Sequence, residues 1–337
     1  MTITRRSFLR SCCAAALASL AVLNATACNN AETPTSPPPA AASSFFVSPA
    51  ATDAAIDTYP DSHYVYLNPD AAAQNKLVVF LPGAGGIPQN YELFVQTAGD
   101  MGYHAIGLMY PNPTDVYNIG TSGCQESADA DCFYKVRYET LTGADSSTLF
   151  VVTPANSILN RLKKLLMYLA AAYPAANWGQ YLDATGNPVW TKIIMGGHSQ
   201  GAGHSVFISK VYPVARVVML ANKDWNTITN QPAPWYALPN ASASNNVYGF
   251  THSQDEFADQ QVVWTALQLG GFGGIVNVDT AVPSYANTRT LTSDAVPAFG
   301  GANTASYHSS VAVDKFTPKN ADGTPAFKPV WQYMLRF

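Results

Sequence analysis

The segment from Lys192 to Tyr212 constrains the fold of this chain more than any other. Lys192 to Met195 form a short apolar run typical of a buried strand, and Ala202 to Tyr212 have the pattern of a helix that Pro213 ends. Between them stands Gly197-His198-Ser199-Gln200-Gly201. This G-x-S-x-G spacing is typical of a sharp strand-to-helix turn that lifts a serine hydroxyl clear of the sheet. It predicts Ser199 as a nucleophile; an ordinary glycine-rich turn is the alternative.

The composition suits one large globular domain. The chain has 337 residues, of which 47% are hydrophobic and 12% are charged, enough to bury one α/β core. Three of the 18 basic residues lie in a leader that we expect to be removed, which leaves 15 against 22 acidic residues. We therefore expect no nucleic-acid partner, because no excess of basic residues is left to neutralise phosphates.

Residues 1–27 have the features of an export signal. Thr4 to Arg10 resemble the twin-arginine signal of bacteria, with Arg5 and Arg6 as the pair. The apolar segment from Cys12 to Ala27 is shorter than the roughly 20 residues that a membrane-spanning helix needs. The sequence therefore predicts a twin-arginine-type signal peptide and a protein of the bacterial cell envelope.

The end of this signal can be interpreted in two ways. Ala25-Thr26-Ala27 fits a conventional cleavage site and a periplasmic or secreted protein. The same residues followed by Cys28 resemble a lipoprotein box, although that pattern prefers leucine at the position of Ala25. We favour acylation of Cys28, which would anchor the protein to a membrane. Residues 28–43 are rich in Pro, Ala and Ser and predict a flexible linker.

Residues 44–337 predict one α/β domain. Apolar runs alternate with helical patterns, which indicates a mostly parallel sheet covered by helices on both faces. In the longest helical pattern, 156–173, we expect Arg161 on a solvated face. Strands are expected at 44–47, 63–67, 76–81, 104–110, 192–195, 215–221, 246–251 and 275–278, and further helices at 91–101, 202–212, 259–269 and 329–335.

The segment 111–153 is a long insertion in this pattern and contains Cys124 and Cys132. In an oxidising envelope this pair predicts a disulfide. A metal site is the weaker interpretation, because no histidine or further cysteine accompanies the pair. We expect a disulfide-braced cap beside the site, and the sequence leaves open whether it moves as a lid.

Residues 60–337 resemble the α/β-hydrolase superfamily on the strength of this order and of the G-x-S-x-G motif. More narrowly, Trp178 together with Trp190 to His204 resembles a bacterial subgroup of exported proteins. The resemblance implies an α/β-hydrolase fold and a serine hydrolase mechanism, and it leaves the substrate open.

A serine nucleophile needs a base and an acid, which in this superfamily follow the serine in the order acid, then histidine. Of six histidines, only His308 lies well past the expected strands, in the loop Ser-Tyr-His-Ser-Ser. His198 is too close to Ser199 and favours a packing or supporting role. Asp255 is the expected acid because it follows the second strand beyond the serine; Asp224 and Glu256 are the alternatives.

The oxyanion of such a reaction needs two preorganised donors. One is expected from the backbone N–H of Gln200, at the start of the helix. The other is expected from the loop Pro82-Gly-Ala-Gly-Gly86, where Ala84 aligns best and Gly85 next. An ordinary glycine turn is the alternative interpretation of that loop.

Three aromatic residues near the expected acid, Trp225, Trp235 and Tyr236, either line an acyl or aryl pocket or pack the cap onto the core. The predicted activity is hydrolysis of a small or polymeric carboxylic ester through an acyl-enzyme. A lipase, polyester depolymerase or peptidase is the nearest alternative, and a catalytically silent envelope binding protein is the alternative from another class. We expect no cofactor and no metal, because phosphate-loop, H-E-x-x-H and dinucleotide motifs are absent from the sequence.

Overall fold

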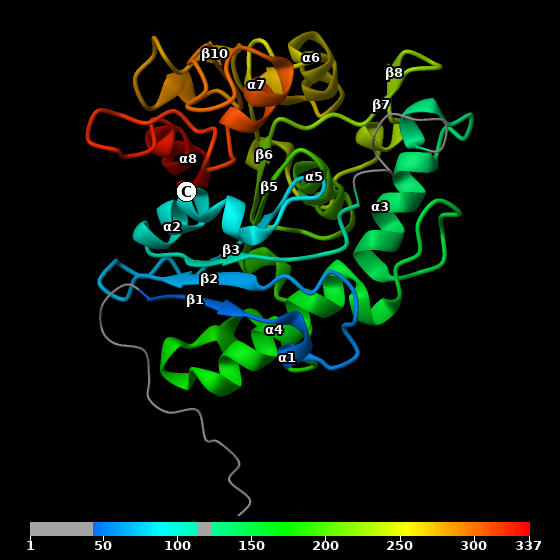
Figure 1. Cartoon of the computed structure of the whole chain (residues 1–337), viewed down its shortest axis with the longest axis vertical. Helices are drawn as coiled ribbons and strands as arrows, with labels where there is room; N and C mark the ends of the chain where they lie inside the picture. The colour runs from blue at the N-terminus through cyan, green and yellow to red at the C-terminus, as the bar shows by residue number, and fades with distance from the viewer. Residues whose placement is uncertain (1–42, 114–122) are drawn as a thin grey trace, which may run out of the picture. The chain divides into compact units, whose positions relative to one another are not determined.

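The computed structural model describes residues 43–113 and 123–337 (Figure 1). Within these residues a nine-stranded sheet has the order β1-β2-β4-β3-β5-β6-β9-β11-β10. Its strands are β1 (Ser43–Val47), β2 (His63–Leu67), β3 (Leu77–Leu81), β4 (His104–Gly107), β5 (Ile193–His198), β6 (Arg216–Leu220), β9 (Val247–His252), β10 (Val276–Asn277) and β11 (Thr290–Ser293). A separate hairpin pairs β7 (Trp225–Asn226) with β8 (Gln231–Pro232).

The sheet is parallel from β4 to β10, whereas β2 pairs antiparallel with both β1 and β4. Strand β5 lies between β3 and β6, in the middle of the sheet. An antiparallel start followed by a parallel sheet, with the G-x-S-x-G turn after a central strand, is the α/β-hydrolase fold. The predicted fold class is confirmed.

Helices cover both faces of the sheet (Figure 1). The helices are α1 (Pro49–Thr52), α2 (Glu92–Asp100), α3 (Cys132–Thr142), α4 (Ile158–Ala172), α5 (Gln200–Val211), α6 (Phe257–Ala266), α7 (Thr304–Ser310) and α8 (Lys328–Leu335). Because side chains alternate along a strand, Leu77 and Val79 of β3 enter the core beneath α3 to α6, whereas Val78 and Phe80 enter the core beneath α2 and α8.

Most predicted elements are present with boundaries shifted by a few residues, and β1 begins at Ser43, one residue before the predicted start of the folded part. Helices α3 and α7 and strand β11 were not predicted, because short segments with little apolar periodicity carry a weak signal. The expectation for Arg161 is wrong, since its side chain is fully buried. Its guanidinium donates to the backbone oxygens of Thr58, Tyr59 and Asn156.

The predicted signal peptide, residues 1–27, and the lipidation site Cys28 lie outside the described residues, as does the linker up to residue 42. Within the described ranges, no helix is both long enough and apolar enough to cross a membrane.

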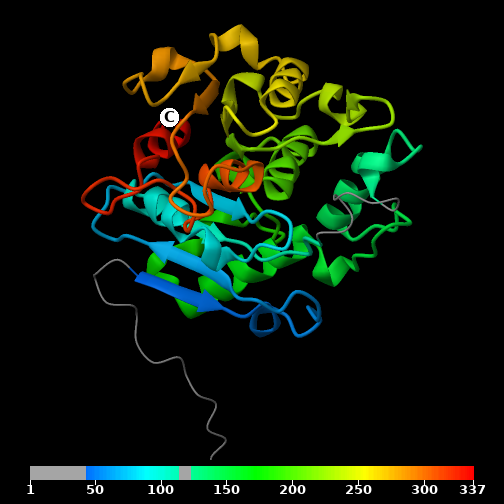
Figure 2. The same cartoon turned by 45° about the horizontal axis from the view of Figure 1, so that its top comes forward.

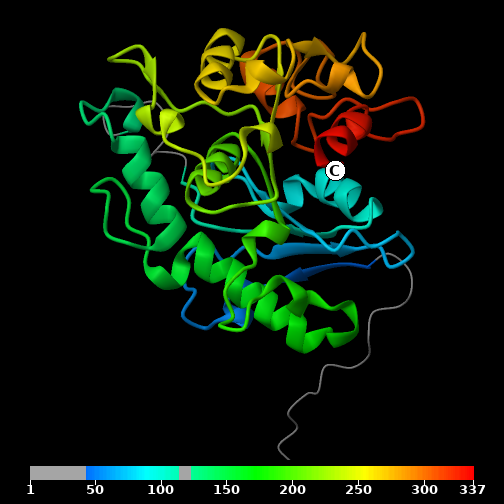
Figure 3. The same cartoon turned by 180° about the vertical axis from the view of Figure 1, so that it is seen from behind.

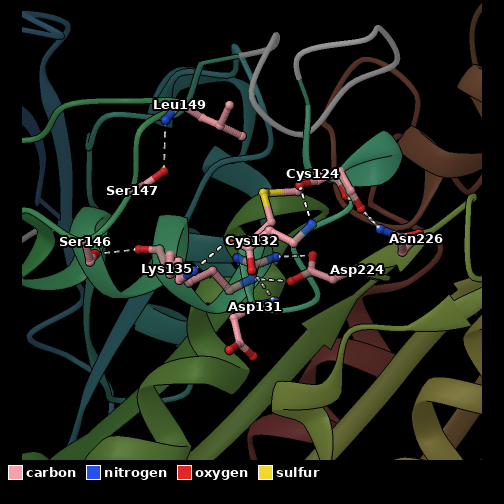
Figure 4. The surroundings of a disulfide bond; sticks show 12 residues. Cys124, Asp131, Cys132, Lys135, Ser146, Ser147, Leu149, Asp224 and Asn226 are labelled. Atoms are coloured by element: carbon pink, nitrogen blue, oxygen red, sulfur yellow. Dashed lines mark hydrogen bonds and ion pairs between the residues drawn. A yellow bond between two sulfur atoms is a disulfide. The ribbon is translucent and has the colours of Figure 1, made fainter.

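The predicted disulfide joins Cys124 to Cys132, with their Cα atoms 5.4 Å apart. It connects a short 3₁₀ turn, Cys124–Glu126, to the first residue of α3 (Figure 4). The same turn is tied to β7, because Asn226 Nδ2 donates to the backbone oxygens of Cys124 and Ser127 at 3.3 and 2.8 Å. Seen from behind, α3 stands beside α4 with the hairpin near its start (Figure 3).

Replacing both Cys124 and Cys132 with alanine is expected to lower the free energy of unfolding by about 2–3 kcal/mol, because the disulfide restricts the unfolded chain even when the loop it closes is short. Urea unfolding of the double variant and of reduced wild-type protein measures the loss. Unchanged stability in both samples would mean that the bonds from Asn226 hold the segment without the disulfide.

Candidate active site

Ser199 stands at the turn between β5 and α5 with a strained backbone, φ 52° and ψ −120°. The neighbouring glycines make this turn possible. A Cβ on Gly197 would lie 2.4 Å from the backbone of Gly201, and one on Gly201 would lie 2.0 Å from the backbone oxygen of Leu81. The helix start and the loop after β3 can therefore approach Ser199 only because both positions lack side chains.

His308 and Asp255 meet at the carboxyl edge of the sheet. Asp255 follows β9, and His308 lies in α7, a short helix where a loop was expected. The Nδ1 atom of His308 lies 2.9 Å from Oδ2 of Asp255. Since a carboxylate only accepts, Nδ1 carries the hydrogen, and Nε2 of the neutral ring is free to accept a proton.

The carboxylate of Asp255 is itself held in place. It accepts from Thr251 Oγ1 at 3.1 Å and from the Glu256 N–H at 3.0 Å, and its side chain is 1% exposed. Burial raises the pKa of Asp255, but the charge of His308 and these hydrogen bonds outweigh it and keep the pKa below its usual value. Asp255 is therefore ionised at neutral pH.

His308 shows the opposite shift. Burial lowers the pKa of the imidazole, but the charge and hydrogen bond of Asp255, together with the charge of Glu256, raise it further, so the net shift is upward. The ring is 30% exposed, which leaves one side open to a substrate. An imidazole with a raised pKa and a free Nε2 is suited to take a proton from a hydroxyl.

The loop after β3 offers one free donor. The N–H groups of Gly83, Gly85 and Gly86 donate to Tyr91 Oη, Asn112 O and Gly83 O, at 3.0, 2.8 and 2.9 Å. The Ala84 N–H has no partner among the described residues. This distinguishes the two predicted donors, because Gly85 is already occupied. The N–H of Gln200, at the first position of α5, has no acceptor within its helix.

These groups surround one cavity of about 690 Å³. It is lined by Ala84, Ser199, Gln200, Asp255 and His308. Figure 2 shows α7 close to the loop after β3. Both segments contribute residues to the lining of the cavity. The disulfide-braced segment adds Gln125 and Phe133 to the wall, so this part of the 111–153 segment borders the cavity.

Asp224, the alternative acid, also lines the cavity, but its carboxylate binds elsewhere. It is buried and forms a two-pronged ion pair with Arg137 of α3 (Figure 4 shows Asp224 near Cys132). Trp235 Nε1 donates to the same carboxylate at 2.8 Å. The third guanidinium nitrogen, Nη1 of Arg137, donates to the Gln200 oxygen at 3.1 Å, so the pair fastens the cap to the start of α5.

The three aromatic candidates lie outside the cavity lining. Trp235 and Tyr236 are 2% and 1% exposed and pack into the core, and Tyr236 Oη accepts from the Asp224 N–H. Trp225 lies under Lys223, whose Nζ is 5.8 Å from the ring centre. The geometry therefore favours the packing role over the pocket role. Glu256, the third acid candidate, pairs with Lys223 at 2.9 Å.

Sequence reasoning did not single out Arg137, Phe133 or Tyr91. Each lies in a segment without a motif. In the structure, burial gives Arg137 a role, and the contacts of its hydroxyl give Tyr91 a role. Among the described residues, no group of three or more His, Cys, Asp or Glu side chains is arranged to hold a metal ion.

Comparison with protein-family models and with curated proteins finds no match. Among solved structures, the chain is similar to one described as a putative dienelactone hydrolase from Klebsiella pneumoniae. The two share 12% identity over 75% of this chain and 84% of that chain, with a TM-score of 0.37. A likeness of this size carries no conclusion about activity.

Proposed function

We propose that the protein is a serine hydrolase that cleaves carboxylic esters through an acyl-enzyme. The observation that carries the proposal is that Ser199, on its strained turn, lines the same cavity as a His308 ring that is hydrogen-bonded to Asp255. A hydroxyl, a base and an orienting carboxylate at one edge of a sheet are the groups that acyl transfer requires.

In the proposed reaction, Nε2 of His308 takes the proton of Ser199 as Oγ bonds to the ester carbonyl carbon. The carbonyl oxygen becomes an oxyanion that accepts from the N–H groups of Ala84 and Gln200. Collapse of this intermediate breaks the bond to the alcohol, which leaves with the proton from His308. Water then attacks the acyl-enzyme by the same route and releases the acid.

A fluorophosphonate probe tests the proposal directly. An active serine hydrolase is labelled on Ser199, which mass spectrometry of the modified peptide identifies, whereas a silent binding protein is not labelled. A panel of p-nitrophenyl esters of increasing acyl length, a polyester film and peptide substrates then separates an esterase from a lipase, a polyester depolymerase and a peptidase.

The rate should depend on pH with a midpoint above the ordinary imidazole value of about 6.5. The base acts only when neutral. We therefore expect kcat/KM to be low at pH values below the raised pKa of His308 and to rise as the pH increases through it. The charged groups facing the ring are Asp255 and Glu256, which raise its pKa, and Lys223, which lowers it.

A pH–rate profile of the wild type and of Glu256→Gln measures this effect. The variant should have a lower midpoint because one anion is removed from the ring's surroundings. A midpoint at or below 6.5 in the wild type would show that Asp255 does not control the imidazole.

We also propose that the protein is exported and anchored at a membrane through an acylated Cys28. This rests on residues 1–28 of the sequence alone. Mass spectrometry of the mature protein distinguishes the alternatives, since both begin at Cys28 and a mass without lipid on Cys28 would exclude the anchor.

A further inference from the structure

We propose that His198 is a positioning residue. It holds His308, the base, and the loop after β3, here called the oxyanion loop, at fixed positions relative to Ser199. The inference rests on the proposed function and concerns the residue directly before the nucleophile. Three chain segments that are distant in the sequence meet at its side chain: the loop after β3, the end of β5, and α7.

The side chain of His198 forms a hydrogen bond at each ring nitrogen. Nε2 lies 3.0 Å from the backbone oxygen of His308, and Nδ1 lies 3.1 Å from Oη of Tyr91. A carbonyl oxygen only accepts, so Nε2 carries the hydrogen and Nδ1 accepts from Tyr91. Oη of Tyr91 in turn accepts from the Gly83 N–H at 3.0 Å.

The direction of every bond in this chain is therefore fixed. It runs from the Gly83 N–H to Tyr91, from Tyr91 to His198, and from His198 to the backbone of His308. A change in one of these hydrogen bonds alters the donor or acceptor that is available to the next bond. The last bond ends on His308, the residue that supplies the base.

The buried environment keeps this arrangement in a single state. His198 is 4% exposed, and Tyr91 is 3% exposed. Burial is the main reason that the pKa of His198 falls to about 3, and the charge of His308 acts in the same direction. Burial also raises the pKa of Tyr91, so its hydroxyl keeps the proton that it donates. His198 thus stays neutral where His308 titrates.

The packing around this pair leaves little room for movement. A Cβ on Gly83 would lie 2.9 Å from Nδ1 of His198 and 3.3 Å from Cβ of Ser199. One on Gly86 would lie 3.0 Å from Oη of Tyr91. The oxyanion loop is therefore seated directly on the His198–Tyr91 pair.

His308 depends on such a contact because its helix is short. α7 has seven residues, and its cap is the Asn303 side chain, which accepts from the Ser306 N–H. The bond to Asp255 fixes the ring of His308 relative to the segment after β9, and it does not hold the His308 backbone itself. The bond from His198 adds a link between that backbone and the strand that carries Ser199, which sets the gap between base and nucleophile.

Three variants test the proposal. His198→Phe removes both ring nitrogens, and its kcat should fall by about 10–100-fold with KM nearly unchanged, since a misplacement of about 1 Å costs this much without altering binding. His198→Gln keeps an N–H donor that reaches the His308 oxygen and should recover most of the rate. Tyr91→Phe keeps the donor to His308 but leaves the Gly83 N–H unpaired, so its loss should be smaller.

A measurement independent of turnover uses the proton on Nδ1 of His308. Its hydrogen bond to Asp255 should give a downfield NMR signal, assigned by its loss in His308→Gln. We expect the signal in the wild type and in His198→Gln, and a broadened or absent signal in His198→Phe.

The two readouts separate failure of this inference from failure of the proposed function. If His198→Phe had the wild-type kcat and an intact His308 signal, the positioning role would be overturned. The same would follow if the variant were less stable but its folded fraction kept the full rate. A wild-type protein that hydrolyses no ester would contradict the proposed function. The NMR comparison would still decide whether His198 holds His308 in place.

Discussion

Replacing Ser199 with alanine is expected to lower kcat for a short p-nitrophenyl ester by about 10⁵–10⁶-fold, because removal of a serine nucleophile leaves only the oxyanion donors and binding to act on the substrate. The fold should survive. Alanine has a Cβ like serine, so the cost of the positive φ at this position is nearly unchanged. The variant should also lose labelling by a fluorophosphonate.

The matched control is Ser209→Ala on the same helix. The Ser209 hydroxyl donates to the Val206 oxygen at 2.6 Å and lies outside the cavity lining, so this variant should keep the wild-type rate. Circular dichroism and thermal melting show that both variants are folded. Turnover by Ser199→Ala within tenfold of the wild type would end the assignment of the nucleophile.

Replacing Asp255 with asparagine is expected to lower kcat by about 10⁴-fold. The amide of asparagine can donate to Nδ1 of His308, which then favours the tautomer with the hydrogen on Nε2. That tautomer cannot take the proton of Ser199. The loss should therefore appear in kcat at every pH, and the rise of the rate with pH should move to lower values as the anion is removed.

Asp224→Asn is the informative comparison, because both aspartates line the cavity. This change leaves the buried guanidinium of Arg137 without its anion and should lower the free energy of unfolding by about 3–5 kcal/mol. Urea unfolding measures that loss, and kcat is referred to the folded fraction. If Asp224→Asn lowered kcat and Asp255→Asn lowered only the free energy of unfolding, Asp224 would be the catalytic acid and Asp255 a structural residue.

The elbow around Ser199 could be predicted from sequence because its requirements are local. A glycine two residues before and two after the serine, preceded by apolar residues and followed by a helical pattern, is enough to specify a turn with φ 52°. The same is true of strongly apolar strands such as β3, in which every side chain is buried.

Other features depend on contacts between distant segments. Arg161 is fully buried, although its helical position is compatible with solvent, because backbone oxygens from residues 58 and 59 surround it. Glu139 of α3 is likewise buried, and its carboxylate accepts from the N–H groups of Ser146, Ser147 and Val152. A sequence pattern shows that such residues are charged but not which partners offset the cost of burying them.

The amino-acid sequence by itself determined the α/β fold class, the strained serine turn and the short list of histidines and carboxylates that could serve it, since these follow from periodicity, glycine spacing and chain order. Only the tertiary structure shows which members of that list contact one another. Asp255 reaches His308, whereas Asp224 reaches Arg137, and Ala84 keeps a free N–H where Gly85 does not. The physical reason is that a hydrogen bond depends on a separation of about 3 Å, and the folded sheet sets that separation between residues more than 50 positions apart.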